Sequence, residues 1–155
     1  MAEKMLPVMP DGSKIVILTS AAGTFAMVPG VAIKDKLSDK ALTREGVKKI
    51  AEEYSQEVRE KKEPFKDGPF PVYCMSKLLL NVYAKILSKE EQVKKRGIQI
   101  YTCHPGWVKT DMGGPMAPMS IEEGTMCPCF LINLPWKIDE AFQGEFFCKS
   151  VVTPL

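Results

Sequence analysis

A tyrosine and a lysine four residues apart are the side chains in this sequence best suited to chemistry. Tyr73 and Lys77 lie in VYCMSKLLLN, residues 72–81, whose apolar spacing predicts a helix. Side chains with this separation lie on one helix face, so the phenol and the ammonium are expected to be neighbours. A neighbouring cation stabilises phenolate and lowers a tyrosine pKa from its usual value of about 10. Such a phenol can protonate the alkoxide that forms when a hydride attacks a carbonyl group.

This spacing is a weak signal by itself, because the chain has four tyrosines and 21 lysines and arginines. The structural alternative is a tyrosine near a helix start, followed one turn later by a solvated lysine. The chemical interpretation therefore depends on the elements before and after the helix.

A short apolar run precedes the helix and ends at a serine. Residues 14–20, KIVILTS, are rich in branched side chains and lie between two glycine-containing turns. Such a run is typical of a strand buried on both faces, as in a parallel sheet covered by helices. Ser20 stands at the carboxyl end of this strand, the edge at which open α/β sheets bind ligands. Its hydroxyl can hydrogen-bond a substrate carbonyl there, or it can simply cap a turn.

A second strand is predicted after the helix, at residues 98–104, IQIYTCH, and Pro105-Gly106 ends it. The intervening helix, expected to end near residue 89, is long enough to connect two parallel strands. Ser20, the helix and residues 105–110 are therefore expected at one carboxyl edge of a single sheet. A Pro-Gly turn there brings the backbone close to a ligand, because glycine has no Cβ.

Periodicity and capping signals predict the remaining elements. Thr43 is a plausible N-cap, and Ser120 with Glu123 has the spacing of a capping box. Pro128 is expected to kink or shorten its helix. The predicted set comprises helices at residues 43–62 and 120–133, a final strand at 144–148, and loops at 24–42 and 64–71. The resulting order, β-α-α-β-α-β, fits one domain over residues 1–155.

The composition, with 45% hydrophobic and 26% charged residues, is that of a soluble globular domain. A net charge of +2 gives no argument for a nucleic-acid or anionic-membrane partner. No apolar stretch approaches the roughly 20 residues of a spanning helix, and no signal-peptide core opens the sequence, so a cytoplasmic location is expected. The five cysteines are expected to be reduced, and Cys127 and Cys129 lack a second Cys/His pair at metal-ligand spacing.

Three motifs in chain order resemble those of the short-chain dehydrogenases/reductases, most closely the carbonyl reductase branch. They are ILTS at residues 17–20, YCMSK at 73–77 and HPGWVKTDM at 104–112. SIEEG at 120–124 and GEFF at 144–147 also match, so the resemblance covers nearly the whole chain. Residues 24–71 resemble the helical insertion of monomeric carbonyl reductases, which implies a monomer.

The resemblance implies a role for each matching residue. Ser20 would polarise the substrate carbonyl, and Tyr73 would be the acid in reduction and the base in oxidation. Lys77 would lower the tyrosine pKa and hydrogen-bond the nicotinamide ribose of NADPH, the usual donor in this branch. The remaining implied contacts are Pro105, Gly106 and Val108 along the nicotinamide, Thr110 at the carboxamide or phosphate region, and Trp107 and Met112 at the substrate pocket.

Each position also has a structural alternative. Thr110 can cap a loop, Trp107 can pack, and His104 is expected to be a strand-end core residue rather than an acid or base. Met112 and the methionines near it more readily line an apolar loop or pocket than bind a metal. The ordered coincidence of the motifs favours the enzyme.

The cofactor-binding half of the family has no counterpart in the sequence. No Gly-rich dinucleotide motif precedes Ser20, and Asn81 and Asn133 are in the wrong places to replace the family's catalytic asparagine. The predicted fold class is therefore α/β, the C-terminal portion of a Rossmann-like doubly wound parallel sheet without its N-terminal Gly-rich half. The strand that ends at Ser20 would then present an unpaired apolar edge.

Two functional hypotheses follow. The first is an NADPH-dependent reductase of a ketone, aldehyde or quinone, seen as part of a longer chain. The second is a non-catalytic, truncated, reductase-derived module for binding or interaction. An unrelated methyltransferase or hydrolase is not supported, because the sequence contains no acidic cofactor loop and no Gly-x-Ser-x-Gly elbow.

Overall fold

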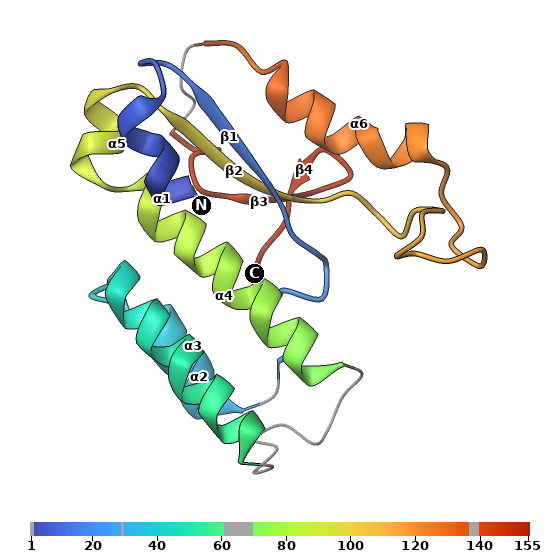
Figure 1. Cartoon of the computed structure of the whole chain (residues 1–155). Helices are drawn as coiled ribbons and strands as arrows, with labels where there is room; N and C mark the ends of the chain where they lie inside the picture. Colours follow the sequence, from blue (N-terminus) through green and yellow to red (C-terminus); the bar gives the residue numbers. More distant parts are fainter. Residues whose placement is uncertain (1, 29, 61–69, 137–139) are drawn as a thin grey trace.

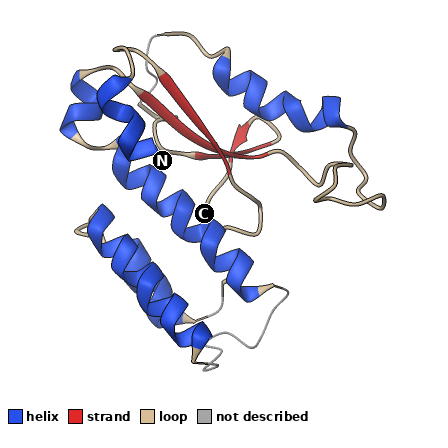
Figure 2. Ribbon diagram, viewed as in Figure 1, coloured by secondary structure: helices blue, strands red, loops and turns tan. Residues whose placement is uncertain are grey.

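The computed structural model describes residues 2–28, 30–60, 70–136 and 140–155, which form one sheet with helices on both faces (Figures 1 and 2). The strands lie in the order β1-β2-β3-β4. β1 (Lys14–Leu18), β2 (Gln99–His104) and β3 (Phe146–Cys148) are parallel, and β4 (Val151–Val152) runs antiparallel to β3. The predicted α/β class with a parallel sheet is confirmed.

Alternate residues of the central strand β2 face two different apolar layers, so residues on both of its faces are buried. Ile100 packs with Leu87 of α4 (Pro71–Ser88) and with Val93 of α5 (Glu91–Lys95). Tyr101 and Cys103 pack instead with Cys127 and Leu131 of α6 (Ile121–Ile132). The helix α1 (Ala2–Met5) and the 3-10 turn η1 (Leu6–Val8) cover the α4 side near the N-terminus (Figure 1).

A pair of helices, α2 (Val31–Ser38) and α3 (Arg44–Arg59), packs on the side of α4 away from the sheet (Figure 1). Thr43 is the N-cap of α3, since its hydroxyl oxygen accepts from the backbone N–H of Gly46 at 3.1 Å. The predicted helix from residue 43 is confirmed as far as Arg59. The predicted end of this helix, at residue 62, lies outside the described residues. The same is true of residues 64–69 in the loop predicted to follow it.

Three described elements were missed by the sequence patterns. Residues 24–42 were predicted to be a loop but contain α2, in which only Leu37 is buried, so the helix depends on its packing rather than on a clear apolar stripe. The short helix α5 was also not predicted. β4 was missed because its turn places Lys149 and Ser150 at positive φ without the glycine or asparagine that usually signals such a turn.

The helix α6 begins with the predicted capping box. The Ser120 hydroxyl oxygen accepts from the Glu123 N–H at 3.2 Å, and the Glu123 carboxylate accepts from the Ser120 N–H at 2.7 Å. Of the two predicted effects of Pro128, a kink or a shorter helix, the shortening does not occur, since the helix continues to Ile132. Burial of Cys127 and Leu131 against the sheet stabilises the turns on both sides of the proline.

β1 lies at one edge of the sheet and, within the described ranges, pairs only with β2. A cavity of about 720 Å³ beside it is lined by residues 15–17 and by Met5, Met9, Leu80 and Tyr83, among others. The expected unpaired apolar edge is therefore present in the described part of the chain. Among the helices of that part, none has the length and apolar character needed to cross a membrane.

Candidate active site

The loop that follows β1 holds Ser20 in a tight turn. The Thr19 N–H donates to the Cys103 carbonyl at 2.8 Å, which extends the pairing with β2 by one residue. Ser20 is buried, and its side-chain oxygen accepts from the Ala22 N–H at 3.1 Å, while its carbonyl accepts from the Gly23 N–H at 2.9 Å. Ser20 therefore does cap a turn. Because the oxygen serves as acceptor in this turn, its O–H remains a donor that can be offered to a substrate oxygen.

This loop is docked on α4, the helix that carries the tyrosine and the lysine. A Cβ added to Gly23 would lie 2.7 Å from the carbonyl carbon of Lys77, so the two backbones are in direct contact. One turn further along, the Asn81 side-chain amide donates to the Gly23 carbonyl at 2.9 Å. The Asn81 bond joins residues 58 positions apart in the sequence, and the two contacts together bring the Ser20 turn against the Lys77 turn.

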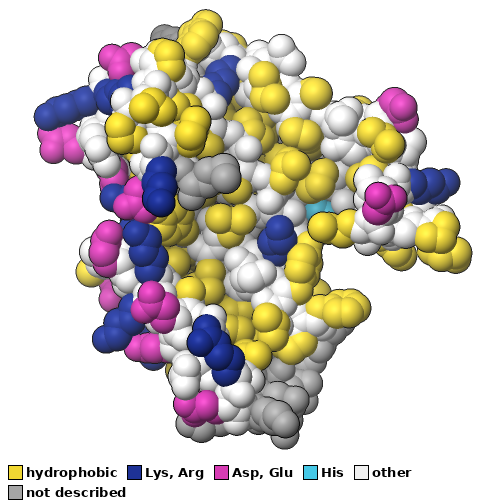
Figure 3. All heavy atoms as spheres, in the orientation of Figure 1, with side chains coloured by type: hydrophobic (Ala, Val, Ile, Leu, Met, Phe, Trp, Pro, Cys, Tyr) yellow, Lys and Arg dark blue, Asp and Glu magenta, His cyan; other side chains and the backbone are white. Residues whose placement is uncertain are grey.

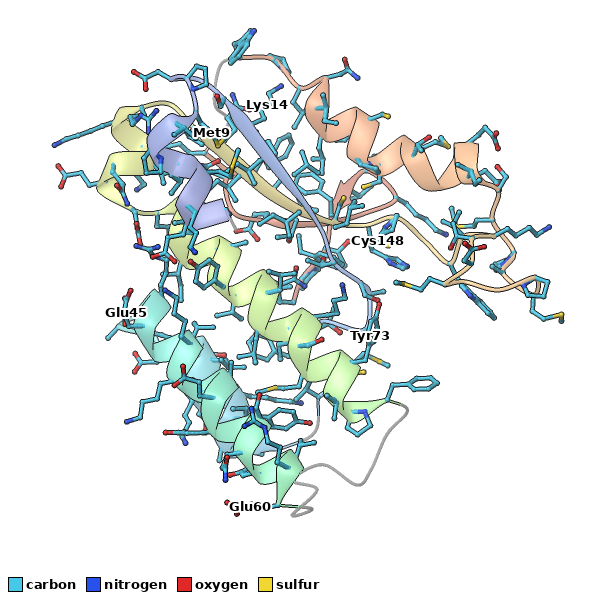
Figure 4. All side chains as sticks on the ribbon, in the orientation of Figure 1. Met9, Lys14, Glu45, Glu60, Tyr73 and Cys148 are labelled. Atoms are coloured by element: carbon cyan, nitrogen blue, oxygen red, sulfur yellow. The ribbon has the colours of Figure 1, made fainter. Side chains whose placement is uncertain are left out.

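Tyr73 and Lys77 occupy successive turns at the start of α4. The Lys77 Nζ lies 5.5 Å from the centre of the Tyr73 ring, so the two side chains are neighbours on one face, as the spacing predicted. Tyr73 is 44% exposed and Lys77 is half-buried. Figure 4 shows Tyr73 near the beginning of α4, beside the loop that leaves β1. The phenol is thus open to a ligand at the carboxyl edge of the sheet.

The loop after β2, residues 105–120, folds back on itself through backbone hydrogen bonds and is called the arm below. The Met119 N–H donates to the Trp107 carbonyl at 3.2 Å, and the Lys109 N–H donates to the Met119 carbonyl at 2.9 Å. Gly106 has φ of 97°, and a Cβ there would lie 2.2 Å from the Met119 sulfur. Only glycine therefore fits the turn that directs the chain away from β2.

Side chains of this arm are partly engaged within it. Thr110 caps a turn, because its hydroxyl oxygen accepts from the Gly113 N–H at 3.1 Å. The Trp107 indole donates to the Gly113 carbonyl at 2.8 Å, yet 56% of the residue is exposed, and Met112 is 94% exposed. Val108 packs closely on Gly124 of α6, which anchors the arm. Trp107 and Met112 are therefore available to a ligand, and Thr110 has the capping role predicted as its alternative.

The arm and the start of α4 enclose an open hollow. Figure 3 shows this hollow between residues 105–120 and the lower part of the molecule, with hydrophobic side chains along its rim. Exposed apolar residues occur on both elements, Val72 and Tyr73 on α4 and Trp107, Met112 and Met116 on the arm. An apolar rim with a few hydroxyl and amine groups is typical of a small-molecule site.

His104, the last residue of β2, is half-buried, and burial lowers the pKa of its imidazole. Its Nδ1 is buried and has no hydrogen-bond partner among the described residues. Cys103 beside it is fully buried, and burial raises the pKa of its thiol to about 12, so this thiol stays protonated. Within the described ranges, no group of three or more His, Cys, Asp or Glu side chains is arranged to hold a metal ion.

The sequence patterns missed the importance of Gly23 and Asn81. Gly23 was used only as a strand boundary, and Asn81 was considered only as a replacement for a catalytic asparagine. The available signal was a polar residue within the apolar stripe of α4, between Leu78 and Val82, which are both buried.

A parallel sheet covered by helices, with a Tyr-x-x-x-Lys helix and a Pro-Gly loop at its carboxyl edge, defines the class of the chain as an α/β fold like that of the reductases whose solved structures it matches. More particularly, the chain is a homologue of the short-chain dehydrogenases/reductases, including carbonyl reductases, which confirms the resemblance found in the motifs. Known family profiles do not match it.

Two curated relatives and one solved structure illustrate this similarity. The chain is 33% identical over 147 residues to short-chain dehydrogenase/reductase 1 of Saponaria officinalis, covering 93% of this chain and 46% of the relative. It is 26% identical over 155 residues to carbonyl reductase (NADPH) 1 of Mus musculus, covering 98% and 56%. The structure of salutaridine reductase from Papaver somniferum matches with a TM-score of 0.78 and 24% identity over 94% of this chain and 48% of that one. The chain thus spans about half the length of these relatives.

Proposed function

We propose that residues 1–155 are part of an NADPH-dependent reductase that converts a ketone, aldehyde or quinone to an alcohol. The observation that supports this most strongly is the contact of Gly23 with Lys77, which packs the Ser20 turn against the helix of Tyr73. The relatives named as NADPH carbonyl reductases favour the same activity and cofactor.

In this proposal the Ser20 O–H donates to the substrate carbonyl oxygen and polarises it. Tyr73 protonates the same oxygen as negative charge develops there. The Lys77 ammonium, held beside the Tyr73 ring, stabilises the phenolate that remains. NADPH, when bound, supplies the hydride. The direction reverses if an alcohol is oxidised, with Tyr73 as the base.

The residues present fit the nicotinamide end of the cofactor better than its phosphate end. Lys77 is half-buried at the site and can donate to ribose hydroxyls, and the Pro105-Gly106 turn leaves the backbone accessible. The proposed cofactor contacts are Tyr73, Lys77, Pro105, Gly106, Val108 and Thr110, and the proposed substrate contacts are Ser20, Trp107 and Met112. The sequence contains no Gly-rich turn for the pyrophosphate.

The domain assignment belongs to the same proposal: residues 1–155 form a single partial Rossmann-like domain, with a helical insertion at about 24–71. The monomeric state and the cytoplasmic location expected from the sequence also remain parts of it.

Substitution of Tyr73 in the complete native polypeptide tests the reaction. Tyr73→Phe should lower kcat by about 10²- to 10⁴-fold, the usual contribution of a general acid, while the protein still binds NADPH, because phenylalanine keeps the ring. Tyr83→Phe is the matched control, since this tyrosine lies on the same helix and its hydroxyl donates to Glu3 at 3.1 Å. Full activity of the Tyr73→Phe protein would reject the acid role.

The second candidate, a non-catalytic module derived from a reductase, is favoured by the absence of a pyrophosphate motif from the sequence. Isothermal titration of residues 1–155 with NADPH distinguishes the two. Binding in the micromolar range, abolished by Lys77→Ala, counts against the non-catalytic module.

A further inference from the structure

Asn81 is a fully buried amide in an apolar part of α4. The residue is 1% exposed, and the adjacent positions Leu78, Leu79 and Val82 are buried hydrophobic residues. Burying an amide there is costly unless it is hydrogen-bonded, and asparagine is a poor helix former. The bond from its Nδ2 to the Gly23 carbonyl, at 2.9 Å, offsets this cost, while its Oδ1 has no partner among the described residues. The stability of α4 alone therefore does not explain why an asparagine occupies this buried position.

The bond from Asn81 is the first link of a short chain that ends at Ser20. Asn81 fixes the carbonyl of Gly23, and the Gly23 N–H donates to the Ser20 carbonyl at 2.9 Å. Within the same turn the Ala22 N–H donates to the Ser20 hydroxyl oxygen at 3.1 Å, which orients that side chain. The contact of Gly23 with the Lys77 backbone lies one helical turn away. The Asn81 bond and the Lys77 contact together hold the Ser20 turn against the part of α4 that carries Lys77 and Tyr73.

We propose that Asn81 is a positioning residue for the reduction, acting on the substrate only through Ser20. This inference rests on the proposed function, because it assigns Ser20 the task of holding the substrate carbonyl. A shift of about 1 Å in a positioning group is enough to lower a rate by about two orders of magnitude, so one loop anchor has a measurable effect.

Hydrogen exchange tests the structural half of the proposal without reference to activity. In Asn81→Ser the side chain is too short to reach Gly23, and the amides of Ala22 and Gly23 should exchange about tenfold faster, the equivalent of one hydrogen bond. Ser88→Ala is the matched control: it removes another buried side-chain bond of α4, to the Lys85 carbonyl at 2.8 Å, and leaves the loop untouched. Equal exchange in Asn81→Ser and the wild type would overturn the proposal.

A double-mutant cycle in the complete native polypeptide tests the functional half. Asn81→Ser should lower kcat about tenfold when Ser20 is present, but by less than about twofold in a Ser20→Ala background, because the anchor then has nothing left to position. The Kd for NADPH should be unchanged in both. Independent, multiplicative losses would show a general structural role and overturn the proposal.

Two further outcomes are distinguishable. If the wild type shows no carbonyl reduction, the proposed function fails, and with it the catalytic half of this inference, while faster exchange at Ala22 and Gly23 still identifies Asn81 as the loop anchor. If Asn81→Ser does not fold, Gly23→Ala is measured by the same two assays, because a methyl group there pushes the loop off Lys77 and so also disturbs the Asn81 bond to the Gly23 carbonyl.

Discussion

Replacing Gly23 with alanine is a direct test of the contact that assembles the candidate site. Gly23 is not among the described glycines with positive φ, so alanine suits its backbone conformation. The added methyl group, however, would lie 2.7–2.8 Å from the carbonyl carbon, Cβ and carbonyl oxygen of Lys77. Two of these atoms belong to the helix backbone and cannot rotate away. The loop must therefore move off α4.

The expected loss in free energy of unfolding follows from the two contacts that this movement disturbs. Overpacking against fixed atoms costs about 1–3 kcal/mol, and the Asn81 bond to the Gly23 carbonyl contributes about 1 kcal/mol more. The free energy of unfolding should fall by about 2–4 kcal/mol in total. For a chain of 155 residues this corresponds to a loss of about 5–15 °C in Tm.

Urea denaturation and thermal unfolding of the native protein measure this loss, and Gly114→Ala is the control. Gly114 has the opposite properties: its φ is 73°, and a Cβ there meets no atom within 4 Å. Its substitution should cost only the left-handed strain of about 1–2 kcal/mol and should leave Ser20 in place. If Gly23→Ala were as stable as the wild type, the backbone contact with Lys77, and the assembly of the site that depends on it, would be refuted.

Three further predictions concern groups outside this contact. Burial lowers the pKa of His104 below 6.5, so the unfolded chain takes up the proton first as the pH falls. The free energy of unfolding should therefore be fully retained above about pH 6.5 and should decline below it. His104→Gln should make the free energy of unfolding, measured by urea titration, less dependent on pH in this range. Ser120→Ala removes the N-cap of α6 and should destabilise the protein by about 1 kcal/mol in the same assay, whereas an unchanged midpoint would contradict the capping box. Leu18→Lys places a charge on the exposed end of the edge strand β1 and should reduce the concentration-dependent association of residues 1–155 in light scattering, which would stay the same if this edge were already covered.

Local signals account for the elements that the sequence predicted. The strand β1 lies in an apolar run rich in branched residues, and the N-cap of α6 is a serine with glutamate three residues later, so each is determined by neighbouring residues. The helix α2 and the strand β4 depend instead on packing and on an unusual turn at Lys149 and Ser150, which no local pattern encodes.

The candidate site divides in the same way. The adjacency of Tyr73 and Lys77 follows from the helical repeat, so it could be predicted from their spacing. The contact of Asn81 with Gly23 joins residues 58 positions apart, and it depends on how closely a loop approaches a helix. Such proximity is a property of the assembled core, and a single sequence gives no measure of it.

The position of Gly23 in the chain gives this contact its significance. Nearly fifty residues separate Gly23 from Tyr73, including the helices α2 and α3, so the covalent chain does not itself hold Ser20 near the tyrosine. The two contacts on α4 occur immediately before this segment begins, at the last residues of the Ser20 turn. They therefore hold the Ser20 turn on α4 independently of the path that the chain takes through α2 and α3. The geometry of the site therefore depends on the packing of Gly23 and on the buried amide of Asn81. The helices α2 and α3 pack on the side of α4 away from the sheet.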